Sequence, residues 1–425
     1  MPPIRFIHAA DLHLDAAFSG LSRDIPADFA ERLRTATFTA FRRLLDLCER
    51  ESPDFLLLAG DVYNQEDASV SAQLALRDGF RRLESLSIPV FLVHGNHDPL
   101  ASRLRSVRWP GNVTVFGELP DAVPVFRKGE GTPLAIIHGA SHASGRETRN
   151  LAALFRRTEA YGLHVGLLHA TPGDADGVAR YAPFSQEDLK ASGMDYWALG
   201  HIHDRREVCR EPLAAYPGCT QGLHINEPGE KGCLLVTAEA RPDGGYAVRT
   251  SFRPLGPAVW KTLDMDLGGA ASLDELENRL RTGLDRAAAE VWSGCEMLLV
   301  RLRLQGRTEL DGLLRKGTTC AELADRLRED GNGVPRIWIK DIDVATRPCV
   351  ERGALLERED LLGEVFRLSE AARTASGLQA LREGPLAPLF AHARAGKALE
   401  QLTDEELARL LDDAESLCLD LLEND

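Results

Sequence analysis

The sequence lacks the features that would place the protein in a membrane or outside the cell. No stretch approaches the ~20 uninterrupted apolar residues that a membrane-spanning helix needs. The first residues, Met1–Arg5, contain no basic region followed by an apolar run, which a secretory signal requires. The eight cysteines form no C-x-x-C pair, so the sequence indicates neither a zinc ribbon nor a disulfide framework. We therefore expect a cytoplasmic protein that does not bind a membrane.

The remaining composition is that of a globular protein with more than one domain. At ~150 residues per domain, a chain of 425 residues suggests two or three domains. The net charge of −15 is distributed unevenly: residues 341–425 contain 19 acidic and 9 basic residues, whereas residues 1–340 contain 46 and 41. Because the acidity lies mainly in the C-terminal part, it does not exclude a polyanionic substrate.

The N-terminal part alternates short apolar runs with amphipathic stretches. Residues 27–50 and 69–87 have the apolar spacing of helices, and turn residues at 229–232 and 241–245 predict an antiparallel hairpin. Alternating strands and helices indicate an α/β layer fold with parallel strand pairs, which we expect to span residues 1–255. The runs that predict buried strands are Ile4–Ala10, Phe55–Ala59, Val90–Val93, Leu134–Ile137, Val165–Leu168 and Tyr196–Leu199.

A change in composition near Pro254–Pro257 marks the start of a second, smaller α/β domain, which we place at residues 256–347. The remainder, residues 348–425, is predicted to be a helical and acidic tail. Within the small domain we expect strands at 259–265, 297–304 and 336–342 and helices at 273–289 and 310–327.

The last segment of the tail is a strong helix candidate. Thr403 and Glu406 have the spacing of a capping box, which satisfies backbone N–H groups at a helix start. The residues that follow are spaced to form one apolar face. This predicted face consists of Leu407, Leu410, Leu411, Ala414, Leu417, Cys418, Leu421 and Leu422.

Clusters of polar residues follow five of the six apolar runs. In open α/β sheets, ligands bind beyond the carboxyl ends of the strands, so we expect these clusters to meet at one edge. Eleven of the twelve histidines lie at or before His224, which also points to a site in this half. The clusters are Asp11-Leu12-His13, Gly60-Asp61, Gly95-Asn96-His97-Asp98, His169-Ala170-Thr171 and Gly200-His201-Ile202-His203.

The chemistry of these clusters suits two metal ions ~3.5–4 Å apart. Imidazole, carboxylate and amide oxygen ligands without thiolates favour manganese, iron or zinc. Such a pair needs a bridging carboxylate, and Asp61, isolated on a glycine turn, is the candidate. Gly60, Gly95 and Gly200 would let the backbone turn sharply and approach the ions.

The motifs D-x-H, G-D, G-N-H-D, H-A-T and G-H-x-H, in this order, resemble the calcineurin-like metallophosphoesterase superfamily. The segments 6–15 and Tyr216-Pro217-Gly218 are similar to the SbcD/YhaO-type DNA repair exonuclease subunits. This resemblance implies a four-layer αββα sandwich, with residues 256–347 as a capping domain. It also implies two metal sites, the first held by Asp11, His13, Asp61 and His203 and the second by Asp61, Asn96, His169 and His201.

The resemblance also implies roles beside the metals. His97 would act on the phosphate or protonate the leaving oxygen, and Asp98 would orient the ring of His97. Some nucleases of this family carry a histidine three residues after the bridging aspartate, where this chain has Asn64. Weaker candidates for substrate contact are Arg205, Arg206, His142 and His224, whereas His8, His94, His138 and His164 are predicted to pack in the core.

We therefore expect a manganese-dependent DNA exonuclease that hydrolyses phosphodiester bonds in DNA repair. Two alternatives stay open: a phosphodiesterase or phosphatase for a small molecule, and a non-catalytic DNA-binding subunit. The family resemblance implies a coiled-coil, SMC-like ATPase as partner. This chain has no G-x-x-x-x-G-K-[ST] motif of its own, so any use of ATP would come from another polypeptide. That partner would dock on the C-terminal helix, which could instead pack on the capping domain; a homodimer is also open.

Overall fold

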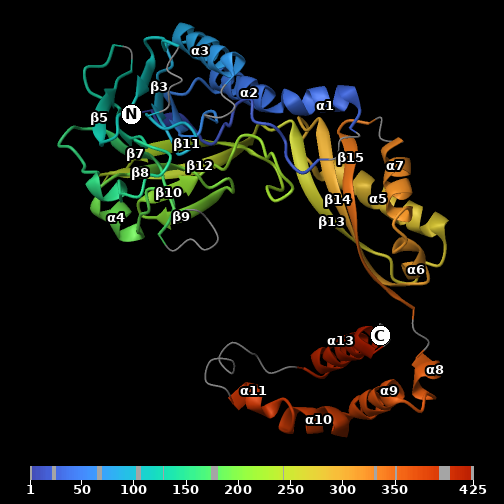
Figure 1. Cartoon of the computed structure of the whole chain (residues 1–425). Helices are drawn as coiled ribbons and strands as arrows, with labels where there is room; N and C mark the ends of the chain where they lie inside the picture. The colour runs from blue at the N-terminus through green and yellow to red at the C-terminus, as the bar shows by residue number, and fades with distance from the viewer. Residues whose placement is uncertain are drawn as a thin grey trace. The chain divides into compact units, whose positions relative to one another are not determined.

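The structure is a computed structural model that consists of two compact units, which we describe separately (Figure 1). The first unit contains residues 1–266, 273–305 and 313–345, and the second contains residues 267–272, 306–312 and 346–425. No helix among the described residues combines the length and the apolarity needed to cross a membrane. The described residues are 2–21, 25–64, 69–101, 107–127, 129–173, 180–242, 244–329, 333–349, 352–391 and 403–422.

The first of two six-stranded sheets is built around the N-terminal strand. Strands β1 to β4 are parallel, whereas β11 pairs antiparallel with both β1 and β12, as the predicted hairpin requires. The order of this sheet is β12 (Tyr246–Pro254), β11 (Gly232–Ala240), β1 (Ile4–Ala9), β2 (Phe55–Ala59), β3 (Val90–Val93) and β4 (Val113–Val115).

The second sheet contributes the other half of the sandwich. Its central strands β6, β7, β8 and β10 are parallel, and the edge strands β5 and β9 are antiparallel to their neighbours. All six strands predicted from apolar runs are present. The order is β5 (Asp121–Val125), β6 (Ala135–Ala140), β7 (Leu163–His169), β8 (Tyr196–Gly200), β10 (Leu213–Tyr216) and β9 (Arg206–Arg210).

The two sheets enclose a core in which side chains alternate between the two faces of each strand. Phe6 points between the sheets and stacks on Phe55 at a ring distance of 4.6 Å, whereas Ile7 faces the covering helices. His8 is buried against the hydroxyl of Tyr196, at 2.9 Å. His94, His138 and His164 are buried as well, which confirms the prediction that these four histidines lie in the core.

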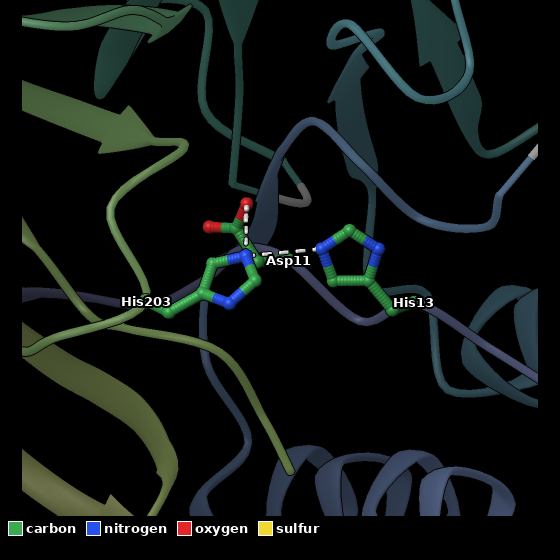
Figure 2. Close-up of side chains that lie close together, drawn as sticks. All are labelled: Asp11, His13 and His203. Carbon is green, nitrogen blue, oxygen red and sulfur yellow. Dashed lines mark hydrogen bonds and ion pairs between the residues drawn. The ribbon is translucent and has the colours of Figure 1, made fainter. Parts of the chain in front are cut away.

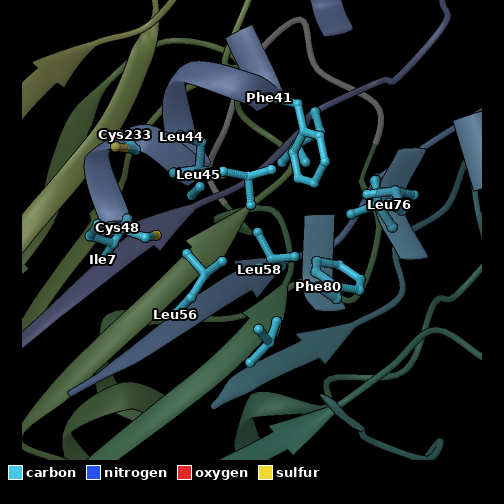
Figure 3. Packing of buried hydrophobic residues seen from close by; sticks show 14 of the residues in the cluster. Ile7, Phe41, Leu44, Leu45, Cys48, Leu56, Leu58, Leu76, Phe80 and Cys233 are labelled. Carbon is cyan, nitrogen blue, oxygen red and sulfur yellow. The ribbon is translucent and has the colours of Figure 1, made fainter. Parts of the chain in front are cut away.

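Helices cover the outer face of each sheet and complete four layers. Helices α2 (Ala36–Glu51) and α3 (Val70–Ser85) lie on the first sheet, and in Figure 3 Phe41 and Leu44 of α2 pack beside Leu58 and Phe80. The preceding helix α1 (Ala27–Arg34) instead buries Phe29 and Leu33 in a cluster with Trp260 and Trp338. The short elements η1 (Ala152–Leu154) and α4 (Gln186–Ala191) pack on the second sheet. The predicted αββα sandwich is therefore confirmed.

A three-stranded sheet forms the smaller α/β part, as predicted. Aromatic residues are prominent where this sheet meets the sandwich. Trp260 and Trp338 pack in one cluster with Phe29, and the indole N–H of Trp260 donates to the carbonyl of Gly222 at 3.1 Å. The domain boundaries stay a prediction. The elements are β13 (Ala258–Asp266), α5 (Leu273–Glu290), β14 (Met297–Thr308), α6 (Asp311–Leu314), α7 (Thr319–Glu329) and β15 (Arg336–Pro348), with sheet order β13-β14-β15.

The tail is helical, and its last helix begins with the predicted capping box, since Thr403 and Glu406 exchange hydrogen bonds. The predicted apolar face of this helix is only partly buried, however. Leu419, which was not assigned to it, packs against other tail helices, while Leu410, Leu417 and Leu421 are 46%, 55% and 65% exposed. The helices are α8 (Arg352–Leu356), α9 (Leu361–Ala372), α10 (Ala375–Glu383), α11 (Ala387–Ala391) and α13 (Asp404–Leu422).

Candidate metal centre

The residues predicted as metal ligands meet where strands of both sheets end. They come from the segments after β1, β2, β3 and β8 and from the last residue of β7. Polar donor atoms of these side chains form two groups, and within each group the histidine and carboxylate atoms lie within 4.8 Å of one another. The first group is Asp11, His13 and His203; the second is Asp61, His169 and His201, with Asn96 beside it.

In the first group, three side chains turn their donor atoms toward one point. Figure 2 shows the same ring nitrogen of His203 facing both Asp11 and His13. The two Nε2 atoms of His203 and His13 are 3.1 Å apart, and Oδ1 of Asp11 lies 3.9 Å from Nε2 of His203. Asp11 is held in place because its carboxylate accepts the backbone N–H of His201 at 3.1 and 3.2 Å.

In the second group, His169 is the central ring. Its Nε2 atom lies 3.0 Å from Oδ1 of Asn96 and 3.3 Å from Oδ2 of Asp61. The ring of His201 is nearby, with 5.1 Å between the two ring centroids. His169 and Asp61 are buried, so their donor atoms are withdrawn from bulk water.

Asp61 joins the two groups. Its Oδ2 atom lies 3.9 Å from Nε2 of His13 in the first group and 3.3 Å from Nε2 of His169 in the second. The other carboxylate oxygen accepts the backbone N–H of His97 at 2.9 Å, which fixes the orientation of the carboxylate. The candidate bridging carboxylate thus stands between both imidazole sets.

The backbone at the site is strained, and it needs glycine beside the polar residues. Asp11, His13, Asp61 and His201 have φ angles of 50°, 40°, 49° and 103°, a region that residues with a Cβ rarely adopt. A Cβ on Gly95 would lie 2.2 Å from Oδ1 of Asp61. Other glycines leave room in the same way: a Cβ would lie 2.5 Å from Nδ1 of His169 at Gly60 and 1.8 Å from the Ala59 carbonyl at Gly200.

In His169, His13 and His203, the ring nitrogen that points away from the site, Nδ1, has a hydrogen-bond acceptor. Nδ1 of His169 donates to the Ala59 carbonyl at 2.9 Å, and Nδ1 of His13 donates to Oδ1 of Asn64 at 2.6 Å. Nδ1 of His203 donates to a carboxylate oxygen of Glu227 at 2.5 Å. These partners assign the proton of the neutral ring to Nδ1, so Nε2 is the nitrogen that would bind a cation.

Burial and neighbouring charges set the protonation of these groups. Burial lowers the pKa of His13 to about 4 and raises the pKa of Asp11 to about 6. Burial alone would raise the pKa of Asp61, but the imidazoles of His169 and His13 outweigh it and hold that pKa below its usual range. Burial opposes charge on His169, yet Asp61 raises the pKa of its ring to about 9, which favours a proton that a bound cation would replace.

The donor set fits divalent cations. When the rings of His13 and His203 are neutral and carry their proton on Nδ1, two lone pairs and a carboxylate converge, a grouping of acceptors that a cation between them would stabilise. Asp61, Asn96, His169 and His201 supply the same mixture of oxygen and imidazole nitrogen at the second point. Such ligands suit manganese, iron or zinc.

His97 and Asp98 lie at this edge, but Asp98 differs from its prediction. His97 is exposed, and its ring is 5.1 Å from that of His13 between centroids. The buried carboxylate of Asp98 was expected to orient His97. Its oxygens instead accept the backbone N–H groups of Gly95, Asp61 and Val62, at 2.7, 3.2 and 3.0 Å, and one of them lies 3.3 Å from Nδ1 of His94. Asp98 therefore ties together the loops after β2 and β3.

The weaker candidates for substrate contact differ in their exposure to solvent. Arg205 and Arg206 are exposed next to His203, with their guanidinium groups 4.0 Å and 5.6 Å from the rings of Phe252 and Tyr216. His224 is half-buried, and its Nδ1 accepts the N–H of Asn226 at 3.1 Å. Substrate contact by these three stays a prediction.

The prediction for His142 needs correction. This ring is fully buried, and its Nε2 donates to the carbonyl of His169 at 2.6 Å. Burial lowers the pKa of His142 to about 4, so the ring is neutral at pH 7. His142 therefore holds the backbone of a candidate ligand, and its ring is too buried to contact a substrate.

Two residues of the site were not found from the sequence. Glu227 lies in the turn between Ile225 and Gly229, where no spacing motif marks it, and Asn64 was noted only as a departure from related nucleases. Both hold a candidate ligand by its outward nitrogen. Their proximity to His203 and His13 depends on how distant segments fold together, and a local pattern does not carry that information.

Comparisons with known proteins agree with this geometry. The profile of the calcineurin-like phosphoesterases matches residues 4–205, and that of the middle domain of metallophosphoesterase YhaO matches residues 260–347. The chain is 34% identical over 388 residues to an uncharacterized metallophosphoesterase YhaO of Bacillus subtilis, covering 90% of this chain and 91% of that protein. It is 27% identical over 319 residues to the DNA double-strand break repair protein Mre11 of Aeropyrum pernix, covering 68% and 69%, and 23% identical over 418 residues to that of Methanopyrus kandleri, covering 85% of each.

The space around Gly95 generates a prediction. Gly95→Ala should weaken manganese binding at least tenfold and lower the free energy of unfolding by about 1–3 kcal/mol, because the new methyl group displaces Asp61 or His169. Calorimetric titration with Mn²⁺ and urea unfolding would measure both effects. The matched control is Gly117→Ala, where a Cβ meets no atom within 4 Å. Wild-type manganese affinity in Gly95→Ala would contradict the account of this loop.

Proposed function

This chain belongs to the calcineurin-like metallophosphoesterases of the YhaO type, and from that premise we propose that it is a two-metal DNA exonuclease subunit. The observation that carries the proposal is the carboxylate of Asp61, which lies between two sets of imidazole and oxygen donors. Exposed His97 lies beside the same carboxylate. A phosphodiester bound at this edge would contact both the centre and the imidazole of His97.

Each side chain of the centre has a defined part in hydrolysis. When bound, two divalent cations would activate a water molecule and offset the charge of the phosphoryl oxygens. Asp11, His13, Asp61 and His203 would hold one ion, and Asp61, Asn96, His169 and His201 the other. His97, tied to Asp61 by its backbone N–H at 2.9 Å, would transfer a proton to the leaving oxygen.

DNA as the substrate is supported by relatives and by local charge. Proteins described as DNA double-strand break repair protein Mre11 match most of this chain, at 23–27% identity. Arg205 and Arg206 are exposed directly after His203, where phosphate oxygens of a nucleic acid would pass. Manganese is the proposed metal because the donor set mixes carboxylate, amide and imidazole groups without thiolates.

One assay separates the proposed function from its alternatives. The purified protein with Mn²⁺ should degrade linear DNA from its ends, whereas Asp61→Ala should be inactive because both ions lose a ligand. Linear duplex DNA, single-stranded DNA and bis-p-nitrophenyl phosphate would be tested in parallel. Hydrolysis of the small ester alone would favour a small-molecule phosphodiesterase. Binding of DNA without hydrolysis would favour a non-catalytic DNA-binding subunit.

The role of His97 can be tested separately from metal binding. His97→Ala should lower kcat by ~10²–10⁴-fold, the usual effect of removing a positioned acid or base. The variant should still bind two Mn²⁺ ions, since none of the proposed ligands changes. Turnover and calorimetric stoichiometry measured on the same preparation would check both statements. A turnover rate near that of the wild type would show that another group protonates the leaving oxygen.

For the partner, we propose that the tail binds a coiled-coil, SMC-like ATPase. Leu410, Leu417 and Leu421 of α13 are exposed at spacings of seven and four residues, which places them on one side of the helix. An exposed leucine stripe of this kind suits a second amphipathic helix.

The stripe also generates a prediction. Leu417→Glu should weaken association with the co-expressed ATPase at least tenfold, because a carboxylate would be buried in an apolar contact. The matched control is Leu273→Glu, at a leucine of α5 that is similarly exposed. Both variants should retain the nuclease activity of the isolated chain. Affinity capture with the ATPase would measure the difference, and equal binding by both variants would contradict docking on this stripe.

A further inference from the structure

Glu227 lies outside the predicted ligand set, yet it makes one of the short contacts at the centre. One of its carboxylate oxygens accepts Nδ1–H of His203 at 2.5 Å, and the other accepts the backbone N–H of Leu223 at 2.6 Å. Both oxygens are therefore engaged, and the carboxylate cannot rotate away without losing a hydrogen bond. His203 is held with Nε2 directed at Asp11 and His13.

The segment that carries Glu227 is anchored by the smaller sheet. Trp260 of β13 donates its indole N–H to the Gly222 carbonyl at 3.1 Å, and its own carbonyl accepts the N–H of Gly229 at 2.9 Å. The side chain of Gln221 bonds both the N–H and the carbonyl of Ala258, at 3.1 and 2.9 Å. Strand β13 thus fixes the segment at both ends, before and after Glu227.

The outward contacts of His13 and His169 are neutral. His13 is held by the amide oxygen of Asn64 and His169 by the backbone carbonyl of Ala59. Of these three rings, only His203 donates its Nδ1–H to a carboxylate. A carboxylate that accepts Nδ1–H makes the opposite nitrogen a stronger donor and fixes the ring, and loss of such a partner commonly costs 10–100-fold in metal affinity.

We propose that Glu227 is a positioning residue that sets the affinity of the first metal site through His203, and that strand β13 of the smaller domain holds it there. The inference rests on the proposed two-metal centre, and it adds a residue that touches neither metal nor substrate. It makes the two sites unequal: the site of His203 depends on Glu227, whereas the site of His169 does not.

The test is stepwise titration of the full-length, metal-free protein with Mn²⁺, followed by calorimetry. Wild type should bind two ions. Glu227→Ala should lose 10–100-fold in affinity at one site and keep the other, while Glu227→Gln should lose less, because its amide oxygen still accepts Nδ1–H. Glu239→Gln, the same chemical change at an exposed position of β11, should match the wild type.

The outcomes separate this inference from the nuclease proposal. Unchanged binding of both ions by Glu227→Ala would overturn the inference, whatever the substrate is. Equal weakening at both sites, together with a lower Tm of the metal-free protein, would also overturn it, since that pattern indicates a purely structural role. Selective loss at one site supports it even if the wild type fails to cleave DNA, a result that would reject only the nuclease proposal.

Discussion

The structure of the site depends on one buried carboxylate shared by two groups of imidazoles. Asp61 is held by the backbone N–H of His97, and its remaining oxygen faces both His13 and His169. Negative charge in a buried position is costly unless positive charge or hydrogen-bond donors surround it. The ends of five strands supply those groups. The chemistry of the centre therefore depends on the topology of the two sheets, which brings these strand ends together.

Backbone groups as well as side chains hold the Asp61 carboxylate in position. Asp98 binds the N–H groups of Gly95, Asp61 and Val62 and so fixes two loops relative to each other. The left-handed backbone at Asp61 and at Asp11 persists because neighbouring segments determine it. Such strain is common where a protein must hold a reactive geometry before its ligand arrives.

Much of this could be predicted from the sequence, because the signals were local. Short apolar runs predicted the six strands, and the polar residues after them predicted where the centre lies. The contacts of Asp98 and Glu227 could not be predicted, since they join segments that are distant in sequence. The buried face of α13 was missed for a related reason. Leu419 and Glu415 both turn inward, and the partners of Glu415 are two arginines outside the helix.

The buried carboxylate of Glu415 has a consequence for the orientation of α13. Glu415 receives two hydrogen bonds from Arg352 at 2.8 Å and a third from Arg373 at 3.2 Å. Buried polar contacts of this type specify register more than they add stability. The rotation of the helix is thereby locked independently of its outward leucines. Substitutions at the outward leucines would therefore leave the orientation of the helix within the tail unchanged.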